Sequence, residues 1–167
     1  MEISSNIVLG ILAVLLIAFV YYLFTNRSKD ADNKEAATDS TRQMQLAAYE
    51  RLILLVDRIS LPNLISRLNQ PGATAKEMQH LLVQSIKQEY EYNISQQIYV
   101  SADAWSAIKN LKEQNILVVN QFATALPPNA TGLDLNKLLL EYLMTDKKGQ
   151  LHEVVSEVLS YEAKKLM

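Results

Sequence analysis

An uncharged apolar run from Ile7 to Thr25 constrains this chain more than any other feature of its sequence. Its length is close to the roughly 20 residues that a helix needs to cross a hydrocarbon layer about 30 Å thick. Glu2 is the only charged side chain before the run, whereas a cleaved secretory signal carries positive charge there. The sequence therefore predicts a transmembrane anchor over residues 1–25, with residues 7–25 in the lipid bilayer; a buried core helix is the alternative.

Basic residues follow the run directly and predict its orientation. Arg27, Lys29 and Lys34 lie just beyond it, and positive residues next to a membrane helix favour the cytoplasmic side. We therefore expect the N-terminus outside and the C-terminal bulk in the cytoplasm. Residues 26–41 mix both charges with small residues and lack apolar periodicity, so they form either a solvated tether or an exposed helical stalk.

Residues 42–167 carry apolar side chains at spacings of three and four, which is typical of amphipathic helices. The whole chain has only four glycines and four prolines, so few positions interrupt such helices. The sequence therefore predicts an all-α protein, in which the transmembrane helix is followed by a single cytoplasmic domain, a bundle of about five helices.

Local signals predict where several of these helices begin and end. Ser60 is expected to cap a short helix that starts near Pro62. The sequence "TAKE" at residues 74–77 has the spacing of a capping box, and its helix is expected to run to about Gln97, followed by a short extended turn. Ser101 is expected to begin a long helix that ends at Pro127 and Pro128 and that buries Trp105 on its apolar stripe.

No segment has the pattern of a catalytic, metal or cofactor site. The chain has no cysteine, and its four glycines are too dispersed for a phosphate-binding loop. Glu77 and His80 have the Glu-x-x-His spacing of di-iron bundles, but His152, the other histidine, lacks the matching second half. With a net charge of −2 and dispersed basic residues, the chain also has no nucleic-acid patch. We expect no enzyme, no metal and no cofactor.

The apolar arc over residues 46–59 is wide for a helix on the outside of a small bundle. Leu54 and Leu55 extend it beyond one stripe, whereas such a helix usually has a single apolar face. The arc is either all core or partly a docking surface for another membrane protein or for a second copy of the chain. The residues expected to contact a partner are Tyr49, Leu52, Ile53, Leu54, Val56, Arg58 and Trp105.

Three phrases of the sequence resemble an uncharacterised family of single-pass membrane proteins from Bacteroidota. They are "YERLILLVDRISLPNLISRL", "EYEYNISQQIYVS" and the spacing W-x-x-I-K-x-x-K-E-Q that begins at Trp105. The resemblance implies a bacterial inner membrane, hence a periplasmic N-terminus, and an all-helical cytoplasmic domain. It transfers no functional residue.

These expectations combine into one functional hypothesis and one alternative. The hypothesis is a non-catalytic, membrane-anchored adaptor or accessory subunit of an inner-membrane assembly, which acts through helix–helix contacts. The alternative is a membrane-tethered helical sensor, which would need a preformed pocket with converging polar groups for a small ligand.

Overall fold

A computed structural model describes residues 38–145 and 151–167 of the chain. The chain divides into two compact units, residues 1–43 and 44–167, and the elements below belong to the second, apart from residues 38–43 of its first helix. The expected membrane helix and residues 26–37 of the expected tether lie outside the described residues. Among the helices that are described, none combines the length and the apolar character needed to cross a membrane.

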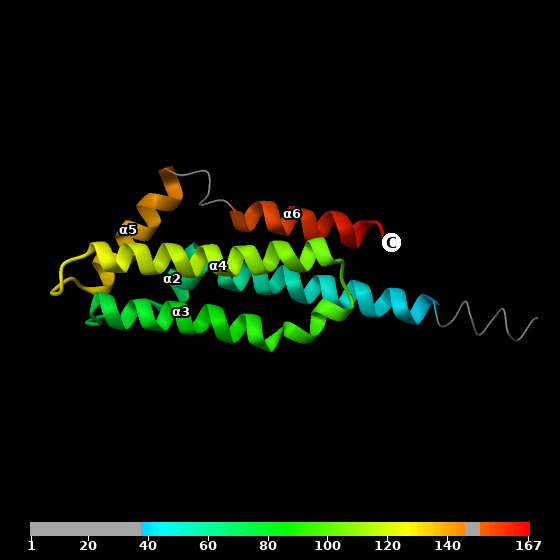
Figure 1. The fold of residues 1–167 in the computed structure, drawn as a ribbon, viewed down its shortest axis with the longest axis horizontal. Helices are drawn as coiled ribbons and strands as arrows, with labels where there is room; N and C mark the ends of the chain where they lie inside the picture. The colour runs from blue at the N-terminus through cyan, green and yellow to red at the C-terminus, as the bar shows by residue number, and fades with distance from the viewer. Residues whose placement is uncertain (1–37, 146–150) are drawn as a thin grey trace, which may run out of the picture. The chain divides into compact units, whose positions relative to one another are not determined.

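The regular elements of the described residues are all helices, which confirms the all-α prediction, and the one β-type contact among these residues is an isolated bridge between Thr74 and Thr131. In Figure 1, α3, α4 and α6 run along a common direction, and α5 is inclined steeply to them. A helix over residues 38–59 comes first. The remaining elements are α2 (Leu61–Leu68), α3 (Ala75–Tyr92), the 3-10 helix η1 (Ile94–Ile98), α4 (Ala102–Ala125), α5 (Gly132–Thr145) and α6 (Leu151–Lys164).

The predicted apolar faces form one hydrophobic core within residues 44–167. In the helix of residues 38–59, the spacing of Leu52, Val56 and Ile59 places all three in this core, and the neighbouring charged residues Asp57 and Arg58 are exposed. The other helices add residues at the same spacing. They include Met78, Leu82 and Ile86 of α3, Ile108, Leu111 and Val119 of α4, Leu135 and Leu139 of α5, and Val155 and Leu159 of α6.

The first turns of α3 and α5 lie side by side and are built alike. The predicted capping box of α3 is confirmed, because Thr74 Oγ1 accepts from the Glu77 backbone N–H while the Glu77 carboxylate accepts from the Thr74 N–H. Thr131 and Asp134 make the same reciprocal pair in α5. The Gly132 N–H donates to the Ala73 carbonyl at 2.7 Å, which joins the two turns.

Gly132 permits this close approach. A Cβ atom at this position would lie 3.2 Å from the Ala73 carbonyl oxygen and 3.2 Å from the Met78 Cβ. Both distances are shorter than ordinary van der Waals contacts, so a side chain here would push α5 away from α3.

Two local predictions were wrong and one was partly wrong. Ser60 does not cap α2, because its hydroxyl donates backward to the Asp57 carbonyl at 2.8 Å. The helix α3 ends at Tyr92, and η1 replaces its expected continuation to Gln97, because the Asn93 side-chain amide turns back to donate to the Glu89 carbonyl. Trp105 packs against the core from a half-buried position, where its ring centroid lies 5.2 Å from that of Tyr90.

Candidate protein-interaction surface

Leu54 is exposed on a helix segment whose neighbouring apolar residues are covered. Leu52, Leu55 and Val56 are at most 1% exposed, whereas Leu54 is 61% exposed. A helix advances about 100° per residue, so residues adjacent to one another in sequence face different sides. Leu54 borders two open grooves, one between its helix and α3 and the other between its helix and α6.

The groove beside α3 combines apolar and polar side chains. Tyr92, at the end of α3, is 79% exposed and contributes an aromatic ring to the groove. The other lining residues come from the helix of residues 38–59, from α3 and from the residue that follows α3, and they are Arg51, Leu54, Leu55, Arg58, Gln88, Glu89 and Asn93.

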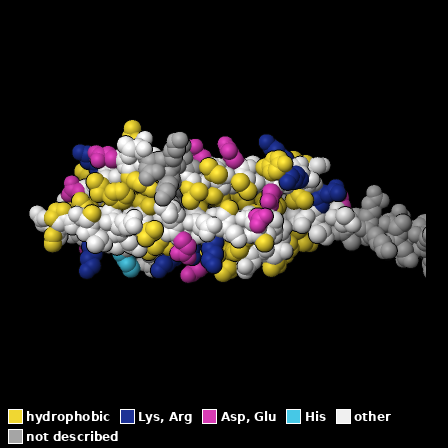
Figure 2. Space-filling view, turned by 45° about the horizontal axis from the view of Figure 1, so that its top comes forward, with side chains coloured by type: hydrophobic (Ala, Val, Ile, Leu, Met, Phe, Trp, Pro, Cys, Tyr) yellow, Lys and Arg dark blue, Asp and Glu magenta, His cyan; other side chains and the backbone are white. Residues whose placement is uncertain are grey.

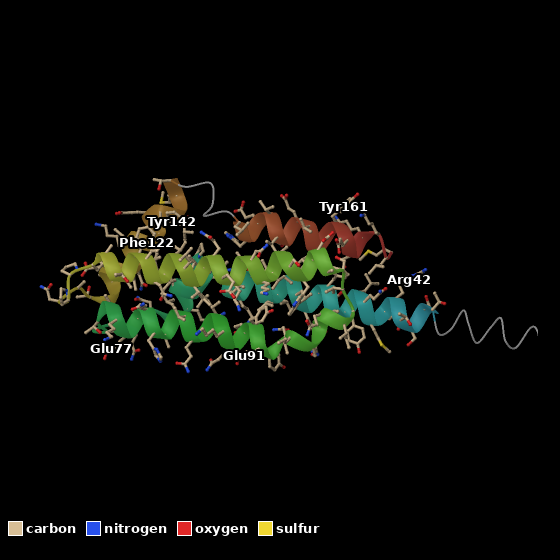
Figure 3. All side chains as sticks on the ribbon, in the orientation of Figure 1. Arg42, Glu77, Glu91, Phe122, Tyr142 and Tyr161 are labelled. Atoms are coloured by element: carbon tan, nitrogen blue, oxygen red, sulfur yellow. The ribbon has the colours of Figure 1, made fainter. Side chains whose placement is uncertain are left out.

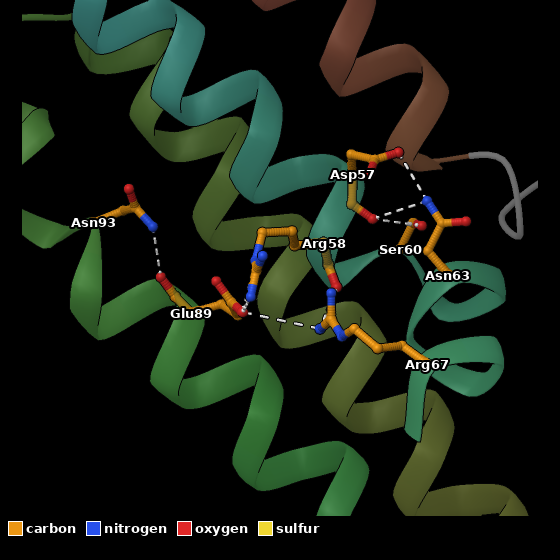
Figure 4. A network of polar contacts seen from close by, with 7 residues as sticks. All are labelled: Asp57, Arg58, Ser60, Asn63, Arg67, Glu89 and Asn93. Carbon is orange, nitrogen blue, oxygen red and sulfur yellow. Dashed lines mark hydrogen bonds and ion pairs between the residues drawn. The ribbon is translucent and has the colours of Figure 1, made fainter. Parts of the chain in front are cut away.

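An ion-pair network holds this groove together at one end (Figure 4). Arg58 Nε donates to Glu89 Oε1 at 2.7 Å, and its Nη2 forms an ion pair with the same oxygen at 2.5 Å. Arg67 of α2 approaches that oxygen to 3.9 Å and donates to the Arg58 carbonyl. Glu89 therefore joins three elements: the helix of residues 38–59, α2 and α3.

This network fixes side-chain geometry more than it stabilises the fold. The hydrogen bond that Arg58 donates to Glu89, and the negative charge of Glu89, raise the pKa of Arg58 above its usual range, so Arg58 stays charged at any physiological pH. Its side chain is 53% exposed, and solvent-exposed ion pairs contribute only about 0–1 kcal/mol. The consequence is a guanidinium held one helical turn after Leu54.

The groove beside α6 also combines apolar and charged side chains. Tyr161 is 63% exposed on α6 and points outward (Figure 3), and Lys165 Nζ lies 4.2 Å from the centre of its ring. The remaining lining residues include three apolar side chains, charges of both signs and two serine hydroxyls, and they are Ile53, Leu54, Val56, Asp57, His152, Glu153, Ser156, Glu157, Ser160 and Lys164.

We call Leu54, Tyr92 and Tyr161, with the two grooves between them, the Leu54 surface. Tyrosine and arginine are the residue types that most often dominate binding energy at protein interfaces, particularly around an apolar anchor. The Leu54 surface has this composition, with charged side chains at its rim. Its chemistry suits an amphipathic protein segment.

The structure brings together only part of the set of residues expected to contact a partner. Ile53, Leu54 and Arg58 line the grooves and retain exposed or half-exposed surface. Tyr49, Leu52 and Val56 are 4% exposed or less, so they offer a partner little area. Trp105 lines neither groove and packs against Tyr90 of α3.

Sequence reasoning missed the residues that α3 and α6 contribute. Glu89, Tyr92 and Tyr161 approach Leu54 only because distant helices pack together. Tyr92 did carry a signal, since it lies outside the apolar spacing that ends at Tyr90, and the opposite face of an amphipathic helix usually faces solvent. No comparable signal marks Glu89.

Glu77, which has the Glu-x-x-His spacing with His80, has a structural role in the first turn of α3. The Glu77 carboxylate accepts hydrogen bonds from the Thr74 N–H and hydroxyl, and these bonds hold its pKa below the usual range. His80 is exposed on α3. Within residues 38–145 and 151–167, no three His, Asp or Glu side chains gather in a way that could hold a metal ion.

Comparison with known proteins identifies a family without assigning a function. No curated protein and no solved structure matches the chain significantly. A family model described as a family of unknown function, DUF7935, matches residues 1–166. The match spans nearly the whole sequence, and the chain therefore belongs to the family of unknown function DUF7935.

Proposed function

We propose that this protein is a non-catalytic, membrane-anchored adaptor or accessory subunit, and that it binds another polypeptide through the Leu54 surface. The observation that carries the proposal is the 61% exposure of Leu54 beside two exposed tyrosines, on a helix whose other apolar residues are mostly covered. Exposed apolar groups that cluster within a polar rim are typical of protein-binding sites.

The membrane part of the proposal rests on the sequence. The uncharged run of residues 7–25 has the length of a membrane span, and Arg27, Lys29 and Lys34 follow it. The resemblance to Bacteroidota membrane proteins suggests a bacterial inner membrane. An anchor there would raise the local concentration of the domain around membrane-bound partners, which compensates for a small binding surface.

A topology reporter tests this anchoring. We expect a reporter fused to the C-terminus to be active on the cytoplasmic side only, and the chain to stay with the membrane fraction after a high-salt wash. Replacing Leu15 and Leu16 by Arg should release the chain, since charge at the centre of a span opposes insertion. A reporter active only outside, or a wild-type chain in the wash, would contradict the proposal.

The binding surface is tested by Leu54→Glu in the full chain, with Leu117→Glu as the matched control. Leu117 is 49% exposed on α4, so both substitutions add one charge at an exposed leucine. We expect both variants to keep the wild-type circular dichroism spectrum. Leu54→Glu should lose the proteins that co-purify in mild detergent, and Leu117→Glu should retain them.

Either of two results would oppose the adaptor proposal. If Leu54→Glu unfolds the domain, Leu54 contributes to the core and the surface is not free. If it folds and keeps every partner, the Leu54 surface is not used for binding. The ligand-sensor alternative predicts that a small molecule binds the wild-type chain saturably and raises its thermal unfolding temperature. Both grooves are open, which favours a protein partner over an enclosed small ligand.

A further inference from the structure

A second apolar stripe lies on α5, away from the Leu54 surface. Leu133, Leu140 and Met144 are 67%, 40% and 88% exposed. Their spacing of seven and four residues places them on one side of the helix, over a length of about 17 Å. The face of α5 that meets the bundle is separate, since it buries Leu135, Asn136 and Leu139.

The stripe is the wall of a groove shared with α2. Ile65 and Ser66 of α2, with Asn69 directly after it, form the opposite wall. The Asn136 side-chain amide donates to Asn69 Oδ1 at 3.2 Å, and the Phe122 and Tyr142 rings meet at 5.2 Å between α4 and α5 (Figure 3). These contacts hold α5 in place, so the stripe is presented on a fixed helix. Figure 2 shows hydrophobic side chains gathered along the middle of the face that it presents, with most charged groups toward its edges.

The charges beside the stripe are self-complementary. Lys137 and Glu141 line the same groove and flank the same edge of the stripe, and they are themselves only 4.0 Å apart as an i, i+4 pair. When two identical helices pack antiparallel, residues on one edge face the same edge of the other copy. A pair centred at the level of residue 139 then places Lys137 opposite Glu141 of the other copy, and the reverse.

The apolar residues match in the same register. Leu133 of one copy lies opposite Met144 of the other, to within one residue along the helix axis. Leu140 lies next to the centre of the pair, where the two-fold axis that relates the copies passes. In a parallel pair, the edge that carries Lys137 and Glu141 would instead face the opposite edge of the other copy, so these two charges would not pair with each other across the interface. The charged residues of α5 therefore favour the antiparallel arrangement, which is isologous, and the apolar residues fit it.

We infer that the occupant of this groove is a second copy of the chain, paired through antiparallel α5 helices. The short stripe predicts a small interface and a reversible dimer. The inference is independent of the Leu54 surface, so a failure of one leaves the other standing.

The chain contains no cysteine, so a single introduced cysteine reports one position only. The full chain carrying Leu140→Cys, purified in mild detergent, should be joined into a covalent dimer by a short bis-maleimide linker. Leu117→Cys, at a leucine of similar exposure on α4, should stay monomeric under the same conditions. A mixture of Leu133→Cys and Met144→Cys chains should give more dimer than either variant alone, because only the mixed pair brings the two cysteines together.

Charge reversal tests the register without relying on cross-linking. Lys137→Glu places two acidic residues opposite each other at both ends of the pair. The dissociation constant of the dimer, measured by sedimentation velocity, should therefore rise about tenfold. Lys137→Glu combined with Glu141→Lys restores opposite charges and should recover the wild-type dimer. The inference is overturned if Leu140→Cys cross-links no better than Leu117→Cys, or if the double reversal fails to recover what the single reversal loses. Circular dichroism of each variant identifies any loss of folding. If a variant is unfolded, the mixture of Met144→Cys and Leu133→Cys chains, both at exposed positions, decides whether the antiparallel dimer forms.

Discussion

Individual polar residues connect the helices of this protein at points where its apolar stripes are interrupted. Asn115 lies on the buried face of α4 and is 8% exposed, and its amide donates to the Ile59 carbonyl at 2.7 Å. Ile59 ends its helix, so its carbonyl has no partner within the helix. The Tyr49 hydroxyl also connects two helices, because it donates to the Glu162 carboxylate of α6 at 2.5 Å. Burial and this hydrogen bond raise the pKa of Tyr49.

The first prediction concerns Asn115. Asn115→Ala removes the donor and leaves the buried Ile59 carbonyl unpaired, so the free energy of unfolding should fall by about 2 kcal/mol. Asn129→Ala, at an exposed asparagine in the loop before α5, is the control and should have almost no effect. Urea denaturation of both variants measures the difference. Equal midpoints would show that water or another group satisfies the carbonyl.

At the level of elements, the paired first turns of α3 and α5 bring two helix N-termini together. The backbone dipole of each helix places partial positive charge at its N-terminus, so two positive helix ends lie close together. Glu77 and Asp134 offset this charge, and hydrogen bonds from the backbone and hydroxyl of Thr74 and Thr131 hold the pKa values of these carboxyl groups below their usual ranges. Gly132 lets the two turns approach.

The second prediction is a dependence of stability on acid pH. Because both carboxyl groups have lower pKa values in the folded chain, the unfolded chain binds protons more readily as the pH drops. Their contribution is therefore present above pH about 4.5 and is lost as the pH falls through the folded pKa values. Chains carrying Glu77→Gln and Asp134→Asn should be less stable at pH 6 and lose less stability between pH 5 and pH 3. Parallel pH profiles of mutant and wild type would contradict this.

At the scale of the whole domain, the Leu54 surface and the α5 stripe are separate apolar areas that the core of residues 44–167 leaves uncovered. The two areas have different chemistry. The Leu54 surface combines a leucine with tyrosines and several unlike charges, which suits a different polypeptide, whereas the α5 stripe is complementary to itself. A protein with both surfaces could bind a partner while it is dimeric.

The third prediction separates core from surface on one helix. Val56 is 1% exposed, so Val56→Glu buries an unpaired carboxylate and should cost more than about 4 kcal/mol, enough to unfold the domain. Leu54→Glu adds the same charge two residues away on an exposed site and should leave the denaturation midpoint nearly unchanged. If both variants unfold at the same denaturant concentration, the separation of the two faces is wrong.

The sequence by itself determined the features that depend on neighbours within one helical turn. Apolar spacing identified the buried faces of α3 and α4, and the Thr74 to Glu77 spacing identified a capping box that the structure contains. Such features are predictable because residues three or four apart contact one another in any helix, whatever surrounds it. Their information lies entirely within a short segment.

Only the tertiary structure decided which side of a wide apolar arc is covered. Leu54 and Leu55 are adjacent leucines, yet one is 61% exposed and the other 1%, because the neighbouring helices reach only one of them. Packing between helices likewise joined Arg58 to Glu89, which lies on a helix that begins sixteen residues after Ile59. Contacts between distant segments depend on how whole helices pack, and no spacing within one segment encodes that packing.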